Sequence, residues 1–407
     1  MERFTVTAAL LKEHFLKIYG PSDEDVRLFA SPARINIIGE HIDYNGGKVF
    51  PAAIDRYLYC AIRKRKDKKI IYNDLFFPGT YVFYTDDTFT FDKKNDYANF
   101  LNGILSCIKK HNTLPCGFEI LIASNIPSAG GISSSSALEC GFAWAVNETF
   151  NLNYTRKEIA LMGQESEHEF MNVNCGIMDQ YIIATGKKNT AELLDCAKIE
   201  HEYIPLNLGN YKFVVMNTKK QRKLSDSKYN ERRSECEKGL EILQNAAILL
   251  KNKGLVSNTK DLPDLCSLTP VQFEECKACI KDETISKRVR HCVTEMDRVQ
   301  KSVEALKNNS LIKLGKLLYE SHESLKNDYE STGLELDTLV YSAAKQDGCI
   351  GARMTGAGFG GCAIALVHND KINDFIDNIQ REYTQIVGYN AAFFECSSGD
   401  GVKEIYI

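Results

Sequence analysis

Four side chains that can bind or activate a hydroxyl group lie close together near the N-terminus: Arg34, Glu40, His41 and Asp43. They belong to the segment SPARINIIGEHIDYNGG, residues 31–47. Carboxylates and an imidazole this close together can accept and donate the paired hydrogen bonds that fix the hydroxyl groups of a sugar. Taken singly, Asp43 is better explained as a turn residue and His41 as a buried histidine with satisfied hydrogen bonds. The cluster as a whole favours a binding site.

A second candidate is the loop PSAGGISSSSAL, residues 127–138, in which two glycines precede four serines. Gly130 and Gly131 allow close approach of the backbone, and free N–H groups at the start of the following helix attract phosphate. The serine hydroxyls can donate to phosphate or bind Mg²⁺. A Gly/Ser turn that only caps the helix is the alternative. The pattern Gly-x-x-x-x-Gly-Lys-Ser/Thr does not occur, so the loop is not a P-loop.

A third candidate is the loop MTGAGFGG, residues 354–361, which has glycines at positions 356, 358, 360 and 361. So many glycines indicate that the backbone packs closely against a ligand or another main chain. Alone this is a weak signal. Paired with the serine loop, it suggests two lobes that close on one nucleotide or substrate.

The elements that must position these loops alternate between strands and helices. Thr155 and Glu158 form a capping box that opens a helix to about Met171. Glu167 falls on the inward stripe of that helix, which consists of Ile159, Met162, Gly163, Ser166 and Phe170. Strands are predicted at 57–63, 69–73, 80–83, 118–123 and 362–367. Further helices are predicted at 97–110, 226–251, 270–307, 310–327 and 334–346.

Composition narrows the possible classes of protein. With 407 residues, 44% hydrophobic and 26% charged, the chain is long enough for two or three units, and two lobes around a cleft are expected. A net charge of −4, with acids after each basic run, argues against a nucleic-acid surface. No segment has the 18 apolar residues typical of a membrane span, and residues 1–16 lack a signal peptide. A cytoplasmic protein with reduced cysteines is therefore expected.

One cysteine pattern superficially resembles a metal site. Cys276-x-x-Cys279 is followed by His291 and Cys292. A second paired motif is missing, and the flanking residues are typical of one continuous helix over 270–307. We therefore expect a helix here rather than a metal site.

Together the three loops resemble the motifs of a known enzyme family. GEHIDYNGG is similar to the galactokinase signature, and the serine and glycine loops are similar to the second and third motifs of the wider GHMP small-molecule kinases. The likeness covers most of the chain, because three more stretches also resemble galactokinases: NTKKQRKLSDSKYNERRSECE (217–237), RVRHCVTEMDRV (288–299) and SHESLKNDYESTGLELDTLV (321–340).

This resemblance implies an α+β fold of two lobes with the active site in the cleft. Residues 1–195 would form the N-terminal α+β lobe, with the sugar signature and the serine loop. Residues 196–385 would form a ferredoxin-like C-terminal lobe. The last strands, in residues 386–407, would return to the first lobe.

The resemblance also assigns roles to residues. Asp179, in CGIMDQY, would lie beside the anomeric hydroxyl of the sugar with Arg34 as its cationic partner. Ser135 and Glu167 would bind Mg²⁺, and Tyr97, where many relatives have Trp, would pack against adenine. The implied sugar site comprises Arg34, Glu40, His41, Asp43, Gly176, Asp179 and Tyr229. The implied nucleotide site comprises Tyr97, Gly130, Gly131, Ser133, Ser134, Ser135 and Ser136.

Three positions depart from the family pattern. Ala33 stands where relatives usually have Gly, Ala129 replaces the first Gly of the serine loop, and Ser136 replaces an Ala. An added methyl group can tighten the nucleotide loop, and an added hydroxyl can alter its phosphate contacts. These changes bear on nucleotide affinity more than on the fold.

The implied reaction is ATP-dependent phosphorylation of α-D-galactose at C1, the entry step of the Leloir pathway. Such transfer needs in-line positioning and neutralised charge, and Asp179 would act either as a general base or as an electrostatic anchor. Galactose and ATP are the expected partners of a monomer or weak homodimer. Two alternatives stay open: a kinase for N-acetylgalactosamine, galacturonate or arabinose, and a non-catalytic sugar sensor. Sensors typically lose part of the Ser-Ala loop, which is intact here at 133–137.

Overall fold

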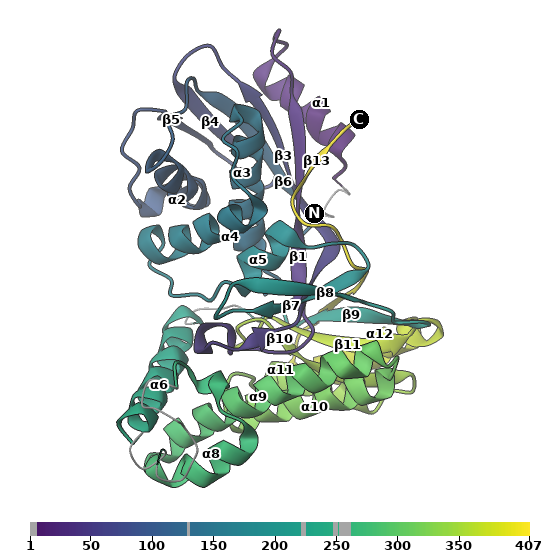
Figure 1. Cartoon of the computed structure of the whole chain (residues 1–407). Helices are drawn as coiled ribbons and strands as arrows, with labels where there is room; N and C mark the ends of the chain where they lie inside the picture. Colours follow the sequence, from purple (N-terminus) through teal and green to yellow (C-terminus); the bar gives the residue numbers. More distant parts are fainter. Residues whose placement is uncertain (1–5, 128–130, 221–224, 247–250, 252–261) are drawn as a thin grey trace.

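The computed structural model describes residues 6–127, 131–220, 225–246, 251 and 262–407. Figure 1 shows two lobes, with α1 to α5 in the upper one and α6 and α8 to α12 in the lower one. The first helix, α1, and the C-terminal end of the chain both lie on the upper lobe (Figure 1). Gly130 and Ala129 of the serine loop lie outside the described residues.

The upper lobe is built on a six-stranded sheet in the order β13-β1-β3-β6-β4-β5, antiparallel except for the pairing of β4 with β6. Its strands are β1 (Arg27–Asn36), β3 (Pro51–Lys64), β4 (Lys69–Asp74), β5 (Thr80–Tyr84), β6 (Phe118–Ser124) and β13 (Lys403–Ile405). Alternate residues of β1, β3 and β6 face opposite sides, so the sheet is apolar on both faces. The four predicted strands of this lobe are confirmed.

Helices cover both faces of this sheet. α1 (Ala8–Tyr19) packs Leu11 and Phe15 on one face, against Leu28, Ala61 and Leu121. α2 (Ala98–Lys109) and α3 (Ser134–Phe150) belong to the larger core on the other face. The predicted helix at 97–110 is confirmed, and α3 begins directly after the serine loop.

The capping box at Thr155 and Glu158 is confirmed, because each residue's side chain bonds the other's backbone. It opens α4 (Arg156–Glu165), which ends earlier than predicted. The next five residues, Ser166–Phe170, form a π-helical turn rather than a continuation of the α-helix. Such turns are frequent at functional sites because they change the direction of side chains. α5 (Met178–Thr185) follows.

A three-stranded sheet of β2 (Lys48–Val49), β7 (Thr190–Asp195) and β8 (Glu200–Pro205) comes next. The boundary predicted at residue 195 falls between the paired strands β7 and β8. Of the C-terminal strands, β13 pairs with β1, whereas β12 (Ala392–Cys396) pairs with β9 of the lower lobe. The division of the chain into lobes at residues 195 and 385 stays a prediction.

The lower lobe has an antiparallel sheet in the order β12-β9-β11-β10, with β9 (Tyr211–Asn217), β10 (Cys349–Thr355) and β11 (Cys362–His368). Numbered within this lobe, the strand order is 4-1-3-2, with helices between the first and second and between the third and fourth strands. This is the ferredoxin-like arrangement. The helices are α6 (Ser225–Asn245), α8 (Pro270–Cys276), α9 (Glu283–Lys307), α10 (Leu311–Asn327), α11 (Leu334–Ala344) and α12 (Ile372–Val387).

The continuous helix predicted over 270–307 is wrong. α8 ends at Cys276, a 3₁₀ turn spans Lys277–Cys279, and α9 begins anew after Asp282. The Asp282 side chain accepts the backbone N–H of Ile285 at 3.1 Å, so it caps the new helix. Of the helix predicted at 226–251, residues 247–250 lie outside the described part of the chain.

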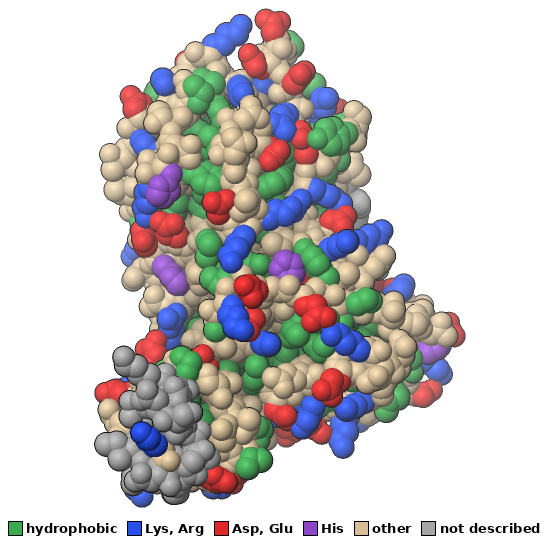
Figure 2. Space-filling view, in the orientation of Figure 1, with side chains coloured by type: hydrophobic (Ala, Val, Ile, Leu, Met, Phe, Trp, Pro, Cys, Tyr) green, Lys and Arg blue, Asp and Glu red, His purple; other side chains and the backbone are tan. Residues whose placement is uncertain are grey.

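Two general features bear on function. No helix in the described part of the chain is long and apolar enough to cross a membrane. On the face shown in Figure 2, basic and acidic side chains are interspersed over both lobes rather than gathered by sign.

Candidate active site

The centre of the candidate site is an ion pair between Arg34 and Asp179. Arg34 lies in β1, and Asp179 lies in the first turn of α5. Nε and Nη2 of Arg34 donate to the two carboxylate oxygens of Asp179 at 2.7 and 2.8 Å. The arginine side chain is 4% exposed and the aspartate 28%, so only the carboxylate reaches solvent. Burial acts to lower the pKa of Arg34, but Asp179 outweighs it and raises that pKa.

Two further contacts tie this pair to the serine loop. Nη1 of Arg34 donates to the carbonyl oxygen of Gly131 at 3.1 Å, and the Ser133 hydroxyl donates to Oδ2 of Asp179. Ser133 is the N-cap of α3 and has a left-handed backbone, with φ of 63°. The start of a buried helix and the Asp179 carboxylate are therefore held side by side.

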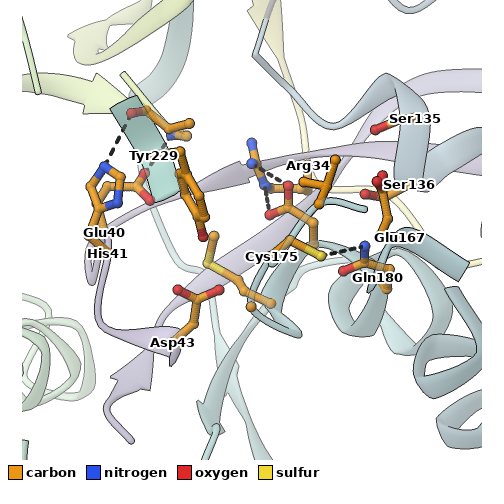
Figure 3. A pocket seen from close by; sticks show the side chains of 16 residues that line it. Arg34, Glu40, His41, Asp43, Ser135, Ser136, Glu167, Cys175, Gln180 and Tyr229 are labelled. Carbon is orange, nitrogen blue, oxygen red and sulfur yellow. Dashed lines mark hydrogen bonds and ion pairs between the residues drawn. The ribbon is translucent and has the colours of Figure 1, made fainter. Parts of the chain in front are cut away.

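Arg34 and Asp179 line a cavity of about 200 Å³. Figure 3 shows Arg34 between a group formed by Glu40, His41 and Tyr229 and a group formed by Ser135, Ser136 and Glu167. The cavity thus brings together ten of the predicted residues, from segments far apart in the chain: Arg34, Glu40, His41, Asp43, Ser135, Ser136, Glu167, Gly176, Asp179 and Tyr229.

Three carboxylates crowd one side of this cavity. Asp43 lies in a 3₁₀ turn, Asp43–Asn45, and burial, followed by the charges of Asp179 and Glu40, raises its pKa to about 7. Burial also raises the pKa of Glu40, while Arg353 and Arg34 oppose that shift. A Cβ atom at Gly176 would fall 1.7 Å from Oδ2 of Asp43. Glycine at 176 is therefore what allows this carboxylate its place.

An aromatic wall completes the end of the cavity that contains Glu40 and His41. His41 stacks on Tyr329 at 4.6 Å between ring centres, and Tyr229 lies 5.6 Å from His41. Nε2 of His41 bonds the carbonyl oxygen of Ala357 at 3.2 Å, and Nδ1 bonds the Tyr44 hydroxyl at 2.8 Å. Since a carbonyl can only accept, Nε2 carries the proton. Burial lowers the pKa of His41 to about 3, so this ring is neutral.

The two glycine-containing loops meet at the cavity. Gly356, in the turn after β10, has φ of 83°, and a Cβ atom there would fall 2.6 Å from the carbonyl oxygen of Gly131. The backbone N–H of Gly356 donates to Oε1 of Glu40 at 2.7 Å. The expectation that the two loops converge on one site agrees with this contact.

A second cavity, of about 310 Å³, opens beside the first. Tyr97 lines it with the aromatic residues Phe76, Phe77 and Phe100, and polar residues that include Asp74, Asp96, Ser134 and Ser135 also line it. Ser135 lines both cavities, so the two cavities adjoin at the serine loop.

The residues expected to hold Mg²⁺ have a suitable set of donor atoms. Ser135 and Glu167 line the first cavity, and Glu167 lies in the π-helical turn. Glu139 of α3 is fully buried, and its carboxyl group lies beside Ser166 and Glu167. Burial, followed by the charge of Glu167, raises its pKa well above the usual range. The Glu167 carboxylate and the Ser135 hydroxyl are the kind of oxygen donors that Mg²⁺ prefers.

Sequence reasoning missed several residues of the site. Glu139 had a usable signal, since it is a single carboxylate in the apolar run 137–146. Gly356 and Ala357 lay in a loop that the sequence singled out without assigning a ligand. Four other residues that line the first cavity received no role from sequence reasoning: Val173, Cys175, Met178 and Gln180.

The cysteine pattern at 276–292 is explained by the fold. Cys276 is buried at the end of α8. His291 uses both ring nitrogens, at 2.9 Å from the Ser324 hydroxyl and at 3.0 Å from the carbonyl oxygen of Glu40. Among the described residues no group of three His, Cys, Asp or Glu side chains is arranged to hold a metal ion.

Comparisons with known proteins agree with this geometry. Residues 13–64 match the model of the galactokinase galactose-binding signature. Residues 99–187 match the GHMP kinases N terminal domain, and residues 302–385 match the GHMP kinases C terminal domain. The first match contains Arg34 and Asp43, the second contains Asp179, and the third contains Gly356.

Whole-chain relatives are similar over nearly their full length. The galactokinase of Clostridium beijerinckii is 44% identical over 97% of this chain and 98% of its own. The galactokinase of Clostridium acetobutylicum is 45% identical over the same shares. The crystal structure of Lactococcus lactis galactokinase complexed with galactose matches with a TM-score of 0.91 and 40% identity, over 98% of this chain and 99% of that one. Methanococcus jannaschii mevalonate kinase shares the fold, with a TM-score of 0.65, 21% identity, and coverage of 93% of this chain and 100% of that one.

Proposed function

Because this chain belongs to the galactokinase family of the GHMP kinases, we propose that it transfers a phosphoryl group from ATP to the C1 hydroxyl of α-D-galactose. The products are galactose 1-phosphate and ADP. The observation that carries the proposal is the Arg34–Asp179 pair, which lies in the sugar-sized cavity and also bonds Gly131 and Ser133 of the serine loop. This reaction begins the use of galactose as a carbon source.

In this proposal the sugar occupies the first cavity. Glu40, Asp43 and the aromatic wall bind the hydroxyl groups of the sugar. Because residue 176 is a glycine, no side chain there displaces the Asp43 carboxylate from the cavity. Asp179 receives donors on both oxygens from Arg34 and Ser133, so its carboxylate is fixed in direction and offers its remaining lone pairs to the C1 hydroxyl. Fixed orientation of the attacking oxygen is the main requirement of phosphoryl transfer.

The nucleotide lies across the second cavity and the start of α3. Tyr97 packs against adenine, and the phosphates lie at the helix N-terminus beside Gly131 and residues 133–136. Gly130, which lies outside the described residues, is expected to belong to the same nucleotide site. Ser135 and Glu167 would hold Mg²⁺, which would supply positive charge to neutralise the phosphates. Ser135 lines both cavities, so the phosphate end of the nucleotide meets the C1 end of the sugar there.

A coupled assay of ADP release tests this function. We expect ADP release that requires galactose, with phosphorus NMR showing the new phosphate at C1. N-Acetylgalactosamine, galacturonate and arabinose should be poor substrates. Galactose binding without ADP release would instead support a sugar sensor, and preference for another sugar in the panel would change the substrate.

Asp179→Asn is the decisive variant. The amide keeps the shape but cannot form the charged pair with Arg34, so we expect kcat to fall by about 10²–10⁴-fold while the protein still folds, with some loss of thermal stability because Arg34 is buried. Asp67→Asn is a matched control, because Asp67 also accepts two hydrogen bonds from one arginine, Arg65, at 2.8 and 2.7 Å, but lines neither cavity. A wild-type kcat in Asp179→Asn would remove this carboxylate from the mechanism.

The remaining proposals concern the protein's setting. We propose that it acts in the cytoplasm, which suits its 14 cysteines, and that it is a monomer or weak homodimer. Sedimentation velocity over a range of concentrations tests the second point.

A further inference from the structure

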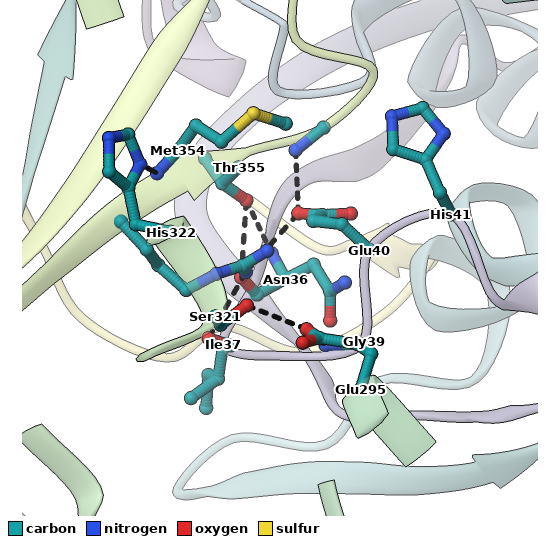
Figure 4. A network of polar contacts seen from close by, with 12 residues as sticks. Asn36, Ile37, Gly39, Glu40, His41, Glu295, Ser321, His322, Met354 and Thr355 are labelled. Carbon is teal, nitrogen blue, oxygen red and sulfur yellow. Dashed lines mark hydrogen bonds and ion pairs between the residues drawn. The ribbon is translucent and has the colours of Figure 1, made fainter. Parts of the chain in front are cut away.

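Arg353 is a fully buried arginine outside the cavity, and it joins the two lobes at the sugar signature. It lies in β10 of the lower lobe, with 0% of its surface exposed. Its Nη1 donates to the carbonyl oxygens of Asn36 and Ile37 at 3.0 and 3.2 Å, and to Oε1 of Glu40 at 3.4 Å (Figure 4). All three acceptors belong to the upper lobe.

The direction of the Glu40 carboxylate is set by this strand and the turn that follows it. Glu40 is 2% exposed and lines the cavity. Its Oε1 accepts both from Arg353 and from the backbone N–H of Gly356, the latter at 2.7 Å. Donors three residues apart on the lower lobe therefore hold one oxygen of a carboxylate on the upper lobe.

The other charges in this region are already matched. Oε2 of Glu295 accepts from Arg298 at 2.7 Å. Its Oε1 accepts from Ser321 and from the backbone N–H of Gly39 (Figure 4). Arg34 is occupied by Asp179 in two hydrogen bonds. Arg353 is thus the cation that compensates the buried charge of Glu40, and a buried carboxylate without such a partner is costly.

We propose that Arg353 is a positioning residue for sugar recognition, which holds the Glu40 carboxylate toward the cavity and links its orientation to the glycine loop at 354–361. The inference rests on the proposed function, in which Glu40 binds a sugar hydroxyl. A lysine here keeps the charge, but its flexible stem does not fix a nitrogen at the place from which Nη1 of Arg353 reaches the two carbonyl oxygens and the carboxylate. Substitution should therefore alter recognition of the one hydroxyl that Glu40 binds.

The test compares kcat and KM of Arg353→Lys, Arg353→Met, Glu40→Gln and the double variants on galactose and its 2-, 3-, 4- and 6-deoxy analogues. We expect Glu40→Gln to lose most of the discrimination against one deoxy analogue, since it weakens one hydroxyl contact. Both Arg353 variants should lose at least tenfold in discrimination against that same analogue, with KM for ATP within about twofold of wild type. The double variants should be no worse than Glu40→Gln alone.

His322→Gln is the matched control. His322 is fully buried and accepts the backbone N–H of Met354 at 3.3 Å, next to Arg353, but does not contact Glu40. It should leave the pattern of discrimination unchanged. The proposal is overturned if the Arg353 variants weaken all analogues evenly, if their effects add fully to Glu40→Gln, or if neither variant folds, since each result means a purely structural role.

Failure of the sugar-site assignment gives a different result. If Glu40→Gln itself leaves the discrimination pattern unchanged, Glu40 does not bind the sugar and both proposals fall together. If Glu40→Gln changes the pattern and Arg353→Lys does not, the sugar site stands and only the role of Arg353 is refuted.

Discussion

Replacing Asp43 with asparagine should stabilise the free protein at alkaline pH while weakening sugar binding. The pKa of Asp43 is raised from 3.8 to about 7, first by burial and then by Asp179 and Glu40. The folded protein therefore holds this proton up to about pH 7, whereas the unfolded chain releases it near pH 3.8. The native state binds more protons in this interval, so the free energy of unfolding falls as the pH rises from about 4 to about 7.

The size of the effect follows from the shift. Between pH 5 and pH 7 the unfolded chain has lost this proton and the folded protein still holds it. Over these two pH units the free energy of unfolding falls by roughly 3 kcal/mol, at about 1.4 kcal/mol per unit. Because Asp43 lines a cavity and keeps some exposure, solvent and salt screen part of this energy. We expect the stability gained by Asp43→Asn to grow by about 1–2 kcal/mol between pH 5 and pH 8.5. Asparagine preserves the shape required by the contact with Gly176.

Urea unfolding of both proteins at pH 5, 6, 7 and 8.5 measures this gain. Burial also raises the pKa of Glu192 to about 8 and that of Asp74 to about 6. These two groups titrate in both proteins, so the difference in unfolding free energy between variant and wild type isolates the contribution of Asp43. Calorimetry at pH 8.5 should show galactose binding at least tenfold weaker in the variant. A difference in stability that does not change with pH, together with unchanged sugar binding, would show that Asp43 is only a turn residue.

Three further substitutions test the remaining parts of the site. Gly356→Ala should lower kcat/KM for galactose at least tenfold, because the added Cβ would clash with the backbone of Gly131. Gly388→Ala is the control, since φ at Gly388 is also positive, at 89°, but nothing lies within 4 Å of the added Cβ; equal losses in both variants would refute the loop contact. Glu167→Gln should weaken Mn²⁺ binding about tenfold in electron paramagnetic resonance titrations, because it removes the carboxylate that lines the cavity with Ser135. Unchanged affinity would exclude Glu167 from the metal site. Tyr97→Ala should raise KM for ATP about tenfold and leave KM for galactose constant, since stacking of an aromatic side chain on a base contributes about 1–3 kcal/mol. An unchanged KM for ATP would place adenine elsewhere.

Local sequence patterns predicted the parts of the fold that depend on nearby residues. The capping box at Thr155 predicted the start of α4, because a cap is a contact between residues three apart. It could not predict the π-helical turn at Ser166–Phe170, which changes the direction of Glu167. The break after Cys276 was missed for a similar reason: the apolar period continues on both sides, and only the cap at Asp282 marks the new helix.

The site was predictable where its residues form motifs and not where they act through contacts between lobes. Arg34 and Asp179 are 145 positions apart, and their convergence was expected only from the family resemblance. Glu139 and Arg353 belong to apolar segments of α3 and β10, where a lone charged residue is ambiguous in the sequence. Only the fold shows that one lies beside Glu167 and the other beside Glu40.

Asp43 and Glu40 are acidic residues that line the first cavity, and Glu139 lies beside Glu167, which also lines it. Burial is the first cause of the raised pKa at Asp43, Glu40 and Glu139 alike, so the ionised forms of all three destabilise the free protein. A sugar that donates hydrogen bonds to Asp43 and Glu40, and a cation near Glu139, would relieve that strain. Ligand binding should therefore raise the thermal stability of the wild type more than that of Asp43→Asn, and an equal rise in both would show that the charges are not strained.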